Sequence, residues 1–380
     1  MKRKKKQIVF INQSSGYMML DICNAYVESR KYDTFVLQTG SIHIRPTKPH
    51  PELKVIKSKR YNKKNNFSRI ISWTISFIHS LLLIWFRFPK AELFLVSNPP
   101  FNIFLPLFCK NNYSVLIFDI YPDILIGQKI LQRKSFFVKL WSYVNRKVMN
   151  KAQHIFTISE GMKYILSQYV DNEKIEVNDI WVHGDFFRPI EKSINPFLLS
   201  MNIDDKFVVQ YSGNMGITHD IEIIVDVAEK MKERSDILFL FVGEGEKKRL
   251  IEEKIGILGL NNCLVLPLQT GDILPYAMGA ADIGIISLDS NSASLSLPSK
   301  TFSYLAIGAV LLCIAPNGSQ LGNMVKKNLL GESFEKTQIN EIGEYIISLA
   351  DNKEKTGTIK NNALRFSLKY TPSNAQKYVK

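Results

Sequence analysis

The stretch Ala281–Ala315, ADIGIISLDSNSASLSLPSKTFSYLAIGAVLLCIA, decides the fold. Its apolar beginning at 282–286 predicts a buried strand, and a polar, serine-rich loop follows. Pro298 opens a predicted helix that ends at Gly308, and a second strand follows at 310–314. Strand, loop, helix and strand in this order are typical of a parallel α/β sheet.

The start of this helix is a candidate site for an anion. Ser296 or Ser299 can supply a capping oxygen, and the open N–H groups and the helix dipole favour negative charge there. Lys300 adds a full positive charge. The stretch therefore predicts a phosphate site between two parallel strands, and it is equally compatible with an ordinary strand–loop–helix that carries an exposed lysine.

The composition indicates a globular protein with an uneven distribution of charge. The 380 residues fit two domains better than one, and the apolar fraction of 46% is normal for a globular chain. Residues 1–70 hold 16 basic and four acidic side chains, so they carry +12 of the total charge of +14. Such a basic end is expected to meet nucleic acid or an acidic membrane, or else it is a solvated face.

The cysteines and the N-terminus indicate a protein of the reducing cytoplasm. Cys23, Cys109, Cys263 and Cys313 lie far apart, which excludes a disulfide framework or a cysteine metal cluster and favours buried thiols. The basic start MKRKKK is followed by about five apolar-leaning residues, whereas a secretory signal needs roughly 7–15. We therefore do not expect export.

The N-terminal half alternates strands and helices in the manner of a Rossmann fold. The loop containing Ser15 and Gly16 joins the first strand to a helix, and it lacks the glycine fingerprint of a dinucleotide site. Asp119 follows a strand directly, at the carboxyl end where open α/β sheets place their chemistry. Strands are predicted at 7–11, 34–38, 92–96, 114–118 and 153–158.

Residues 70–86, IISWTISFIHSLLLIWF, predict an unusually apolar helix. Its polar members Ser72, Ser76, His79 and Ser80 form one narrow stripe. The helix spans about 25 Å, short of the roughly 30 Å hydrocarbon core, so we do not expect it to cross a bilayer. Its flanks are rich in Lys and Arg, which fits a helix lying in an anionic membrane interface; the alternative is a helix packed under the sheet.

The C-terminal half repeats the alternation after a hinge at about 183–200. We therefore expect an α/β fold with two Rossmann-like domains that face each other across an interdomain cleft. Strands are predicted at 207–211, 237–242, 263–267, 282–286 and 310–314, and helices near 219–234, 246–258, 272–279, 299–307 and 338–351. The expected organisation is an acceptor-binding domain at 1–190 with a membrane-associating helix at 69–87, a nucleotide-sugar-binding domain at 197–360, and a tail at 361–380 that can pack back on the first domain.

Four motifs of the second half occur in order. They are YSGNMG at 211–216, FLFVGEGE at 239–246, LVLPLQTGDILPYAMGAADIGIISL at 264–288 and LPSKTFSYLAIGAVLL at 297–312. Together they resemble the GT-B glycosyltransferases of the large retaining family 4, especially the bacterial capsule, lipopolysaccharide and exopolysaccharide branch. The first half agrees more loosely, through VSNPP, DIYPD and HGDFFRP, so the resemblance covers nearly the whole chain.

Two departures from the family pattern affect the donor site. The family commonly has two glutamates where this chain has Leu295 and Ser303, so donor contacts must be made differently. The Arg and Lys that commonly meet the donor diphosphate correspond here to Asn214 and His219. A protonated or hydrogen-bond-donating His219 can still meet a phosphate, in a pH-dependent way, and the alternative is a histidine at the start of a surface helix.

The resemblance implies which residues meet the substrates. Lys300 is the catalytic candidate that stabilises the leaving diphosphate, and Asp119 is the candidate that interacts with the acceptor hydroxyl, with a cap or turn residue as its alternative. No D-x-D-like motif is present, so neither a metal nor another cofactor is expected. The donor-binding candidates are Ser15, Gly16, Gly213, Asn214, His219, Gly243, Glu244, Pro267, Leu297, Pro298, Ser299 and Ser303.

The expected function is that of a hexosyltransferase in surface polysaccharide biosynthesis. It would move a sugar from a nucleotide sugar, a UDP-sugar, to a polyprenyl-diphosphate-linked glycan, with retention and without a metal. Such an acceptor implies a peripheral protein on the anionic cytoplasmic face of the inner membrane. The alternatives are a sugar-nucleotide 2-epimerase of the same fold and an inactive basic protein that binds membrane or nucleic acid. Since the basic residues lack the interleaved aromatics of an RNA-binding module, no nucleic-acid partner is expected.

Overall fold

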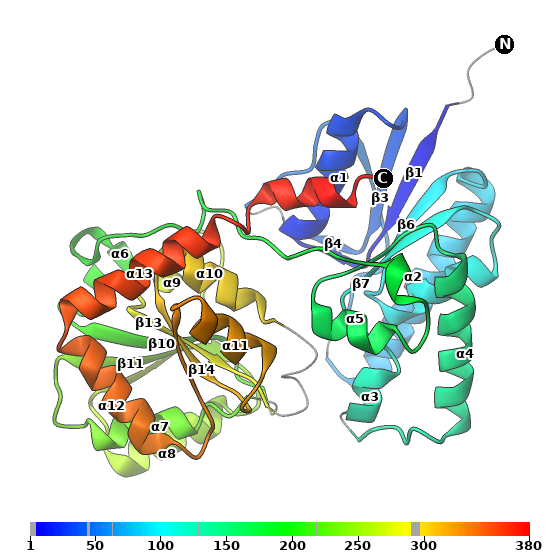
Figure 1. The fold of residues 1–380 in the computed structure, drawn as a ribbon. Helices are drawn as coiled ribbons and strands as arrows, with labels where there is room; N and C mark the ends of the chain where they lie inside the picture. The colour runs from blue at the N-terminus through cyan, green and yellow to red at the C-terminus, as the bar shows by residue number, and fades with distance from the viewer. Residues whose placement is uncertain (1–4, 44–45, 63, 128, 217–218, 290–296) are drawn as a thin grey trace. The chain divides into compact units, whose positions relative to one another are not determined.

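The computed structural model of the protein divides the chain into two α/β units (Figure 1). It describes residues 5–43, 46–62, 64–127, 129–216, 219–289 and 297–380. Unit 1 comprises Met1–Ile180 and Pro372–Lys380, and unit 2 comprises Trp181–Thr371. Unit 2 therefore begins before the expected hinge at 183–200. The expected tail at 361–380 is divided, because its first part completes a helix of unit 2 and its last part belongs to unit 1.

Unit 1 is built on a parallel sheet of seven strands, as far as the chain is described, in the order β5-β3-β1-β6-β7-β8-β9. The strands are β1 (Gln7–Ile11), β3 (Thr34–Thr39), β5 (Leu53–Lys57), β6 (Glu92–Val96), β7 (Tyr113–Ile117), β8 (Ile155–Thr157) and β9 (Ile175–Val177), beside a small pair, β2 (Ser14–Ser15) and β4 (Ser41–Ile42). The helices are α1 (Tyr17–Ser29), α2 (Asn66–Arg87), η1 (Pro100–Leu107), α3 (Asp123–Gly127), α4 (Phe136–Lys151), α5 (Glu160–Leu166), η2 (Asn172–Lys174) and η4 (Pro372–Tyr378).

Alternate residues of the unit 1 strands point to opposite faces of the sheet, and each face is covered by its own helices. On one face, Val9, Leu93 and Val115 join a core that includes residues of α2, η1, α4 and α5. On the other face, the rings of Phe10 and Phe156 contact Tyr26 of α1 and Tyr378 of η4, respectively. The helices α2, η1 and α4 therefore lie together on one side of unit 1.

Helix α2 turns its small polar residues towards the protein and much of its apolar surface outward. Ser72, Ser76 and Ser80 are 1%, 3% and 0% exposed, which places these three members of the predicted polar stripe against the core, whereas His79 is half-buried. Small side chains at these positions let the helix backbone approach the sheet closely. The exposed residues include Phe67, Ile70, Ile71, Ile75, Ile78, Leu82, Trp85 and Phe86. This is the reverse of the usual arrangement of a surface helix in water.

The length and composition of α2 are also those of a membrane-crossing helix. The window Phe67–Arg87 has a mean hydropathy of 1.5, and 39% of it is buried inside the protein. A core helix of a soluble protein can have the same length and composition. The exposed apolar face, rather than the length, is therefore the feature of α2 that bears on membrane binding.

Unit 2 is built on a second parallel sheet, of six strands within the described residues, in the order β12-β11-β10-β13-β14-β15. Its strands are β10 (Phe207–Asn214), β11 (Ile237–Glu244), β12 (Cys263–Leu266), β13 (Ile283–Ser287), β14 (Val310–Ile314) and β15 (Gly331–Phe334). Its helices are η3 (Lys192–Ile194), α6 (Pro196–Leu199), α7 (Ile223–Lys230), α8 (Lys248–Leu258), α9 (Leu274–Met278), α10 (Ser299–Ile307), α11 (Gln320–Lys327), α12 (Ile339–Ala350) and α13 (Lys353–Ser367).

The segment that decides the fold has the predicted order. The strand expected at 282–286 is β13, the helix expected at 299–307 is α10, and the strand at 310–314 is β14. Gly308 ends α10 with φ of 76°, a left-handed conformation that glycine adopts without strain. β13 pairs with β14 and with β10, so the amino end of α10 follows a strand in the middle of the sheet.

Candidate functional site

The two glycine motifs of unit 2 meet at the carboxyl ends of adjacent strands. In the register of β10 and β11, Gly213 pairs with Gly243 and Asn214 pairs with Glu244. A Cβ on Gly243 would lie 1.9 Å from the carbonyl oxygen of Gly213, so no side chain fits there. Gly213 has φ of 131°, which other residues rarely adopt. The motifs therefore leave bare backbone at this edge of the sheet.

Lys300 points from the first turn of α10 to this glycine edge. Its Nζ lies 3.8 Å from the centroid of the Tyr211 ring, and a Cβ on Gly213 would be 3.3 Å from the same nitrogen. The nitrogen is shielded from solvent and has no hydrogen-bond partner among the described residues. Burial lowers the pKa of Lys300 to about 7. An anionic ligand that binds such an amine gains a charge-assisted hydrogen bond and does not have to replace an existing protein partner.

Tyr211 is a site residue that the sequence analysis missed, although it is the first residue of the YSGNMG motif. Its hydroxyl donates to the carbonyl oxygen of Asn214 at 2.6 Å, which fixes the ring beneath the Lys300 amine. A cation over an aromatic face is stabilised by the ring quadrupole. Tyr211 therefore holds the lysine in place without neutralising it.

The amino end of α10 differs from the prediction in how it is capped. Pro298 is the N-cap residue, with no side-chain cap bond, and Ser299 is the first helical residue, so Ser299 does not supply the capping oxygen. Ser296 and Leu295 lie outside the described residues. Leu297 and Ser303 are half-buried and Ser299 is exposed. Within the described part of the chain no side chain caps the first N–H groups of α10, and these groups and the helix dipole favour an anion beside Lys300.

His219 is held in one orientation by the neighbouring strand. Its Nδ1 lies 2.9 Å from the carbonyl oxygen of Ser287, which can only accept, so this nitrogen carries the proton. Burial lowers the pKa of His219, and Lys300 lowers it further. The neutral ring then presents Nε2 as an acceptor. The Ser287 carbonyl already takes the N–H of this neutral ring, so a hydrogen bond from His219 to a phosphate requires the protonated ring and stays a prediction.

The remaining donor-binding candidates of unit 2 are exposed. Asn214 is exposed, with its Nδ2 beside Gly216, and Glu244 pairs with Lys248 at 2.8 Å. Pro267 follows β12, two strands away from β10 in the sheet order.

Close to His219, a cavity of about 220 Å³ is lined by residues that include Asp220, Leu288, Asp289 and Ala315. It lies at the carboxyl ends of β13 and β14.

The candidates of unit 1 occupy the carboxyl end of its own sheet. Ser15 is fully buried, and its hydroxyl donates to Thr39 Oγ1 at 3.0 Å, so its side chain serves the packing of the loop. Gly16 is the N-cap residue of α1 and has open space where a Cβ would lie. The accessible part of this loop is therefore its backbone at Gly16, not the Ser15 hydroxyl.

Asp119 follows β7 in unit 1, as predicted, and lies in an aromatic recess. Its backbone N–H and that of Phe118 both donate to Ser97 Oγ, at 3.1 and 2.9 Å. Part of the residue is open to solvent, but the surrounding protein groups desolvate the carboxyl and raise its pKa, and Arg69 opposes that rise. Residues lining the recess include Pro100, Tyr121, Trp141 and Asn145.

Several rings form a wall around this recess. Tyr121 stacks on Trp141 with centroids 5.8 Å apart and planes at 16°. Phe101 of η1 contacts both Trp141 of α4 and Trp73 of α2. These rings come from segments far apart in the chain, so the sequence analysis did not associate them with Asp119.

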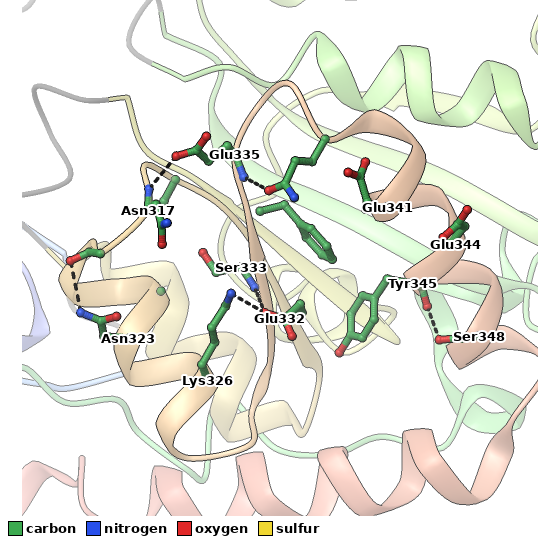
Figure 2. Close-up of a pocket in the computed structure, with 15 residues that line it drawn as sticks. Asn317, Asn323, Lys326, Glu332, Ser333, Glu335, Glu341, Glu344, Tyr345 and Ser348 are labelled. Carbon is green, nitrogen blue, oxygen red and sulfur yellow. Dashed lines mark hydrogen bonds and ion pairs between the residues drawn. The ribbon is translucent and has the colours of Figure 1, made fainter.

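A second hollow of unit 2, of about 630 Å³, runs along the edge strand β15 between α11 and α12 (Figure 2). Its polar groups bind one another. Glu332 pairs with Lys326 at 3.0 Å, Glu335 accepts from the Asn317 N–H at 3.2 Å, and Gln338 accepts from the Glu335 N–H at 2.9 Å. The described residues that line it include none of the predicted donor set. We therefore do not assign the donor to this hollow.

No group of three or more His, Cys, Asp or Glu side chains that could hold a metal ion occurs in the described parts of the chain. The four cysteines are free thiols; Cys23 and Cys313 are buried, and Cys109 and Cys263 are half-buried.

Comparisons of sequence show that most of unit 2 is similar to glycosyltransferases. Residues 200–366 match the family described as Glycosyl transferases group 1. The chain is 21% identical over 225 residues to WbjE of Pseudomonas aeruginosa, named a glycosyltransferase, over 58% of this chain and 55% of that protein. It is 30% identical over 121 residues to WcaI of Escherichia coli K12, named a colanic acid biosynthesis glycosyl transferase, over 32% of this chain and 30% of that protein. The chain thus spans about half of the first relative and less of the second.

Comparisons of structure confirm the GT-B fold. Anabaena HepE, solved in complex with UDP and glucose, has a TM-score of 0.69 at 12% identity, over 98% of this chain and 97% of that chain. WaaG, a glycosyltransferase involved in lipopolysaccharide biosynthesis, has a TM-score of 0.69 at 11% identity, over 98% and 99% of the two chains. A glycosyltransferase from Rickettsia africae has a TM-score of 0.68 at 14% identity, over 99% and 97%.

Proposed function

We propose that the protein is a glycosyltransferase of surface polysaccharide biosynthesis that uses a nucleotide sugar, a UDP-sugar, as donor. The acceptor is a polyprenyl-diphosphate-linked saccharide, and transfer is retaining and independent of metal. The family match of residues 200–366 and the names of WbjE and WcaI support the class of reaction. The complexes of HepE with UDP-glucose and with UDP and glucose support the class of donor.

One observation carries the donor site: the buried amine of Lys300, which has no hydrogen-bond partner among the residues that the structure describes, lies beside the bare backbone of Gly213. A diphosphate placed there accepts from the Lys300 ammonium and from the open N–H groups at the start of α10. Both groups are fixed before the ligand arrives, so little reorganisation is needed as charge develops. In this proposal the lysine and the helix together supply the positive charge that stabilises the diphosphate.

The reaction breaks the bond between the anomeric carbon and the donor phosphate oxygen. The acceptor hydroxyl oxygen forms the new bond to that carbon, and the hydroxyl proton passes to the departing diphosphate or to a protein carboxylate. Retention places the attacking and leaving oxygens on one face of the sugar, so the leaving phosphate itself can take the proton. Lys300 acts by stabilising the negative charge of the diphosphate as the bond breaks.

Asp119 and its aromatic wall are the acceptor side of this proposal. A carboxylate whose pKa is raised can accept a hydrogen bond from a sugar hydroxyl and can hold a proton for part of the reaction. The flat pair of Tyr121 and Trp141 offers an apolar surface next to it. Because the wall includes Trp73 of α2 and Trp141 of α4, the acceptor side is continuous with the helices that carry the exposed apolar residues.

We propose that the protein lies peripherally on the cytoplasmic face of the inner membrane, with α2 in the anionic interface. The support is the outward apolar face of α2, together with the +12 charge of residues 1–70. A lipid-linked acceptor would be extended at that surface.

The proposal is tested by incubating the protein with a panel of UDP-, GDP- and dTDP-sugars and a short polyprenyl-diphosphate saccharide, followed by mass spectrometry of the lipid. We expect the lipid to gain one hexose from one donor, with chelator present. Lys300→Ala should lower turnover by roughly one to three orders of magnitude, because one charge-stabilising group is lost. Transfer by a pure, folded Lys300→Ala protein at the wild-type rate would remove Lys300 from the reaction.

A further inference from the structure

The first turns of α4 expose a compact group of large apolar side chains. Phe136 is 73% exposed and Phe137 is 70% exposed, and their rings contact each other at 6.1 Å. Leu140 and Tyr143, one and two turns on, are also exposed. The helix start itself is well defined, since Ser135 Oγ accepts from the Val138 N–H. These rings therefore project from the capped first turn of a helix.

Helix α4 joins α2 through η1. Phe101 and Phe104 of η1 contact Trp141 of α4, with centroids 6.4 and 5.4 Å away. From the other side, Phe77 of α2 contacts Phe108 at 5.9 Å, and Trp85 Nε1 donates to the Phe108 carbonyl at 2.8 Å. Leu107 and Phe108 are themselves exposed. The three segments share one face of the sheet, so their outward side chains form a surface that we call the α2–η1–α4 face.

The charged side chains of α2 and α4 are all basic. The sequences of α2 and α4 contain no Asp or Glu. Arg133 and Lys134 directly precede α4, and Lys139 lies between its exposed rings; all three are exposed. At the carboxyl end of α2, Arg87 is the last helical residue and Lys90 follows it; both are exposed. Aromatic and aliphatic side chains ringed by Lys and Arg match the interface of a bilayer that contains anionic lipid.

A second copy of the chain fits this face poorly. A two-fold interface sets the same patch against itself, so the basic residues around the apolar centre would face their own like charges. An anionic bilayer instead accepts the apolar side chains and attracts the basic ring at once.

We propose that the α4 rings Phe136 and Phe137, with Leu140, insert into an anionic bilayer as a second anchor beside α2. This inference rests on the proposed function insofar as the acceptor is lipid-linked. A single interfacial helix leaves the protein free to roll about the helix axis, and a second anchor on α4 removes that freedom. The same helix carries Trp141 of the acceptor recess, so the anchor fixes the recess relative to the membrane surface.

The experiment compares variants by flotation with vesicles of phosphatidylcholine, with and without phosphatidylglycerol. We expect Phe136→Ser, Phe137→Ser and Leu140→Ser together to weaken partitioning into the anionic vesicles by roughly 100-fold. Arg133→Gln, Lys134→Gln and Lys139→Gln together should weaken binding to anionic vesicles by about fivefold per residue, and this loss should vanish at high salt. The matched control is Tyr164→Ser with Ile257→Ser, which removes side chains that are 80% and 85% exposed on α5 and α8 and should change nothing.

Circular-dichroism melts verify that each variant is folded. If the apolar α4 triple variant is folded and binds vesicles like the wild type, the second anchor is wrong. It is also wrong if the Tyr164→Ser, Ile257→Ser control loses as much vesicle binding as that variant. Gel filtration at matched concentration provides a further check: a wild-type dimer that the α4 variant converts to monomer, with vesicle binding unchanged, would show a second copy as the occupant. UDP-glucose binding is titrated in the same preparations, so failure of the proposed function appears as absent nucleotide binding and is distinguishable from failure of the anchor.

Discussion

At the scale of single residues, Lys300 combines a charged role with a buried position. Burial lowers its pKa to about 7, because the ammonium ion is poorly solvated in the free protein. A bound diphosphate favours the ammonium form and raises the pKa again. Donor binding above pH 7 therefore takes up a proton, whereas below pH 7 the lysine is already charged.

This coupling gives a pH profile for the affinity. UDP-glucose is the suitable probe, since its diphosphate diester does not titrate near neutrality. We expect constant affinity below pH 7 and a fall of about tenfold per pH unit from pH 7 to 9. Burial also lowers the pKa of His219, so its ring is neutral over that range in the free protein. Calorimetry of the wild type and of Lys300→Met checks the profile. The variant should bind weakly with no slope; a slope in both proteins would assign the proton to another group.

Gly213 is the second residue with a specific requirement. Gly213→Ala is expected to cost about 1–3 kcal/mol of stability, because φ of 131° is strained for any residue with a Cβ. The new methyl group would also lie 3.3 Å from Lys300 Nζ and press on the amine, so donor affinity should fall as well. The matched control is Gly256→Ala in α8, where the position of the Cβ is open. Urea unfolding and UDP-glucose titration of both variants provide the measurement, and equal effects at the two positions would contradict this reading.

The sequence indicates candidate residues for the site but not the interactions that these residues make. Lys300 and Gly213 could be assigned because the helix start and the glycine motif are local patterns. The role of Ser15 could not, since its partner Thr39 lies on another strand. The tautomer of His219 likewise depends on the carbonyl of Ser287, 68 residues away. Such contacts are set by tertiary packing, which no local spacing shows.

At the scale of elements, α2 buries its serines and exposes apolar residues, so substitution of a serine should lower the stability of the protein more than substitution of an outward isoleucine. Ser80 is fully buried and donates to the Ser76 carbonyl, so Ser80→Leu should overpack the contact with the sheet and cost about 1–3 kcal/mol. Ile75→Ser on the outward face should change stability by less than about 0.5 kcal/mol. Denaturant unfolding of the two variants without lipid measures both. If Ile75→Ser is the more destabilising change, the outward face is buried in the native protein.

The same helix shows where the pattern of the sequence was sufficient and where it was not. The stripe of serines was visible, but its direction was not, because a narrow polar stripe can face water or the protein. Trp73 near the helix start is buried, with its ring against Phe101, whereas Trp85 is exposed. A substitution of Trp73 would therefore disturb folding, and tests of membrane binding must use outward residues.

Strand prediction succeeded where strands are apolar and flanked by turns. The strands predicted at 7–11, 92–96 and 310–314 are β1, β6 and β14. The strands β5, β9 and β15 were not predicted; each lies at the edge of its sheet and has three to five residues. β5 reads LKVIK within a basic connection, and β15 reads GESF, so neither shows the continuous apolar run of a central strand.

At the scale of the whole molecule, the last residues of the chain belong to the first unit. Tyr378 is fully buried, its hydroxyl donates to the Asn178 carbonyl, and its own carbonyl accepts from Tyr26. Tyr378→Ala should destabilise unit 1 by about 3–5 kcal/mol, as for other large buried aromatics. Tyr164→Ala, at an exposed position of the same unit, is the control. Calorimetric unfolding measures the effect, with UDP present so that unit 2 is stabilised and unit 1 unfolds at the lower temperature. If Tyr378→Ala leaves the transition of unit 1 unchanged, the C-terminal residues do not pack into unit 1.

The central claim is that unit 2 holds a nucleoside diphosphate between Lys300, the amino end of α10 and the backbone at Gly213. The most direct measurement is calorimetric titration of UDP, GDP and dTDP into wild-type protein and Lys300→Met at pH 6.5, with Lys327→Met on α11 as the matched control. UDP should bind the wild type and the control equally, and Lys300→Met about 10–100-fold more weakly, because one charge-assisted contact is lost. Equal affinity in all three proteins, or no binding of any diphosphate to the wild type, would contradict the account.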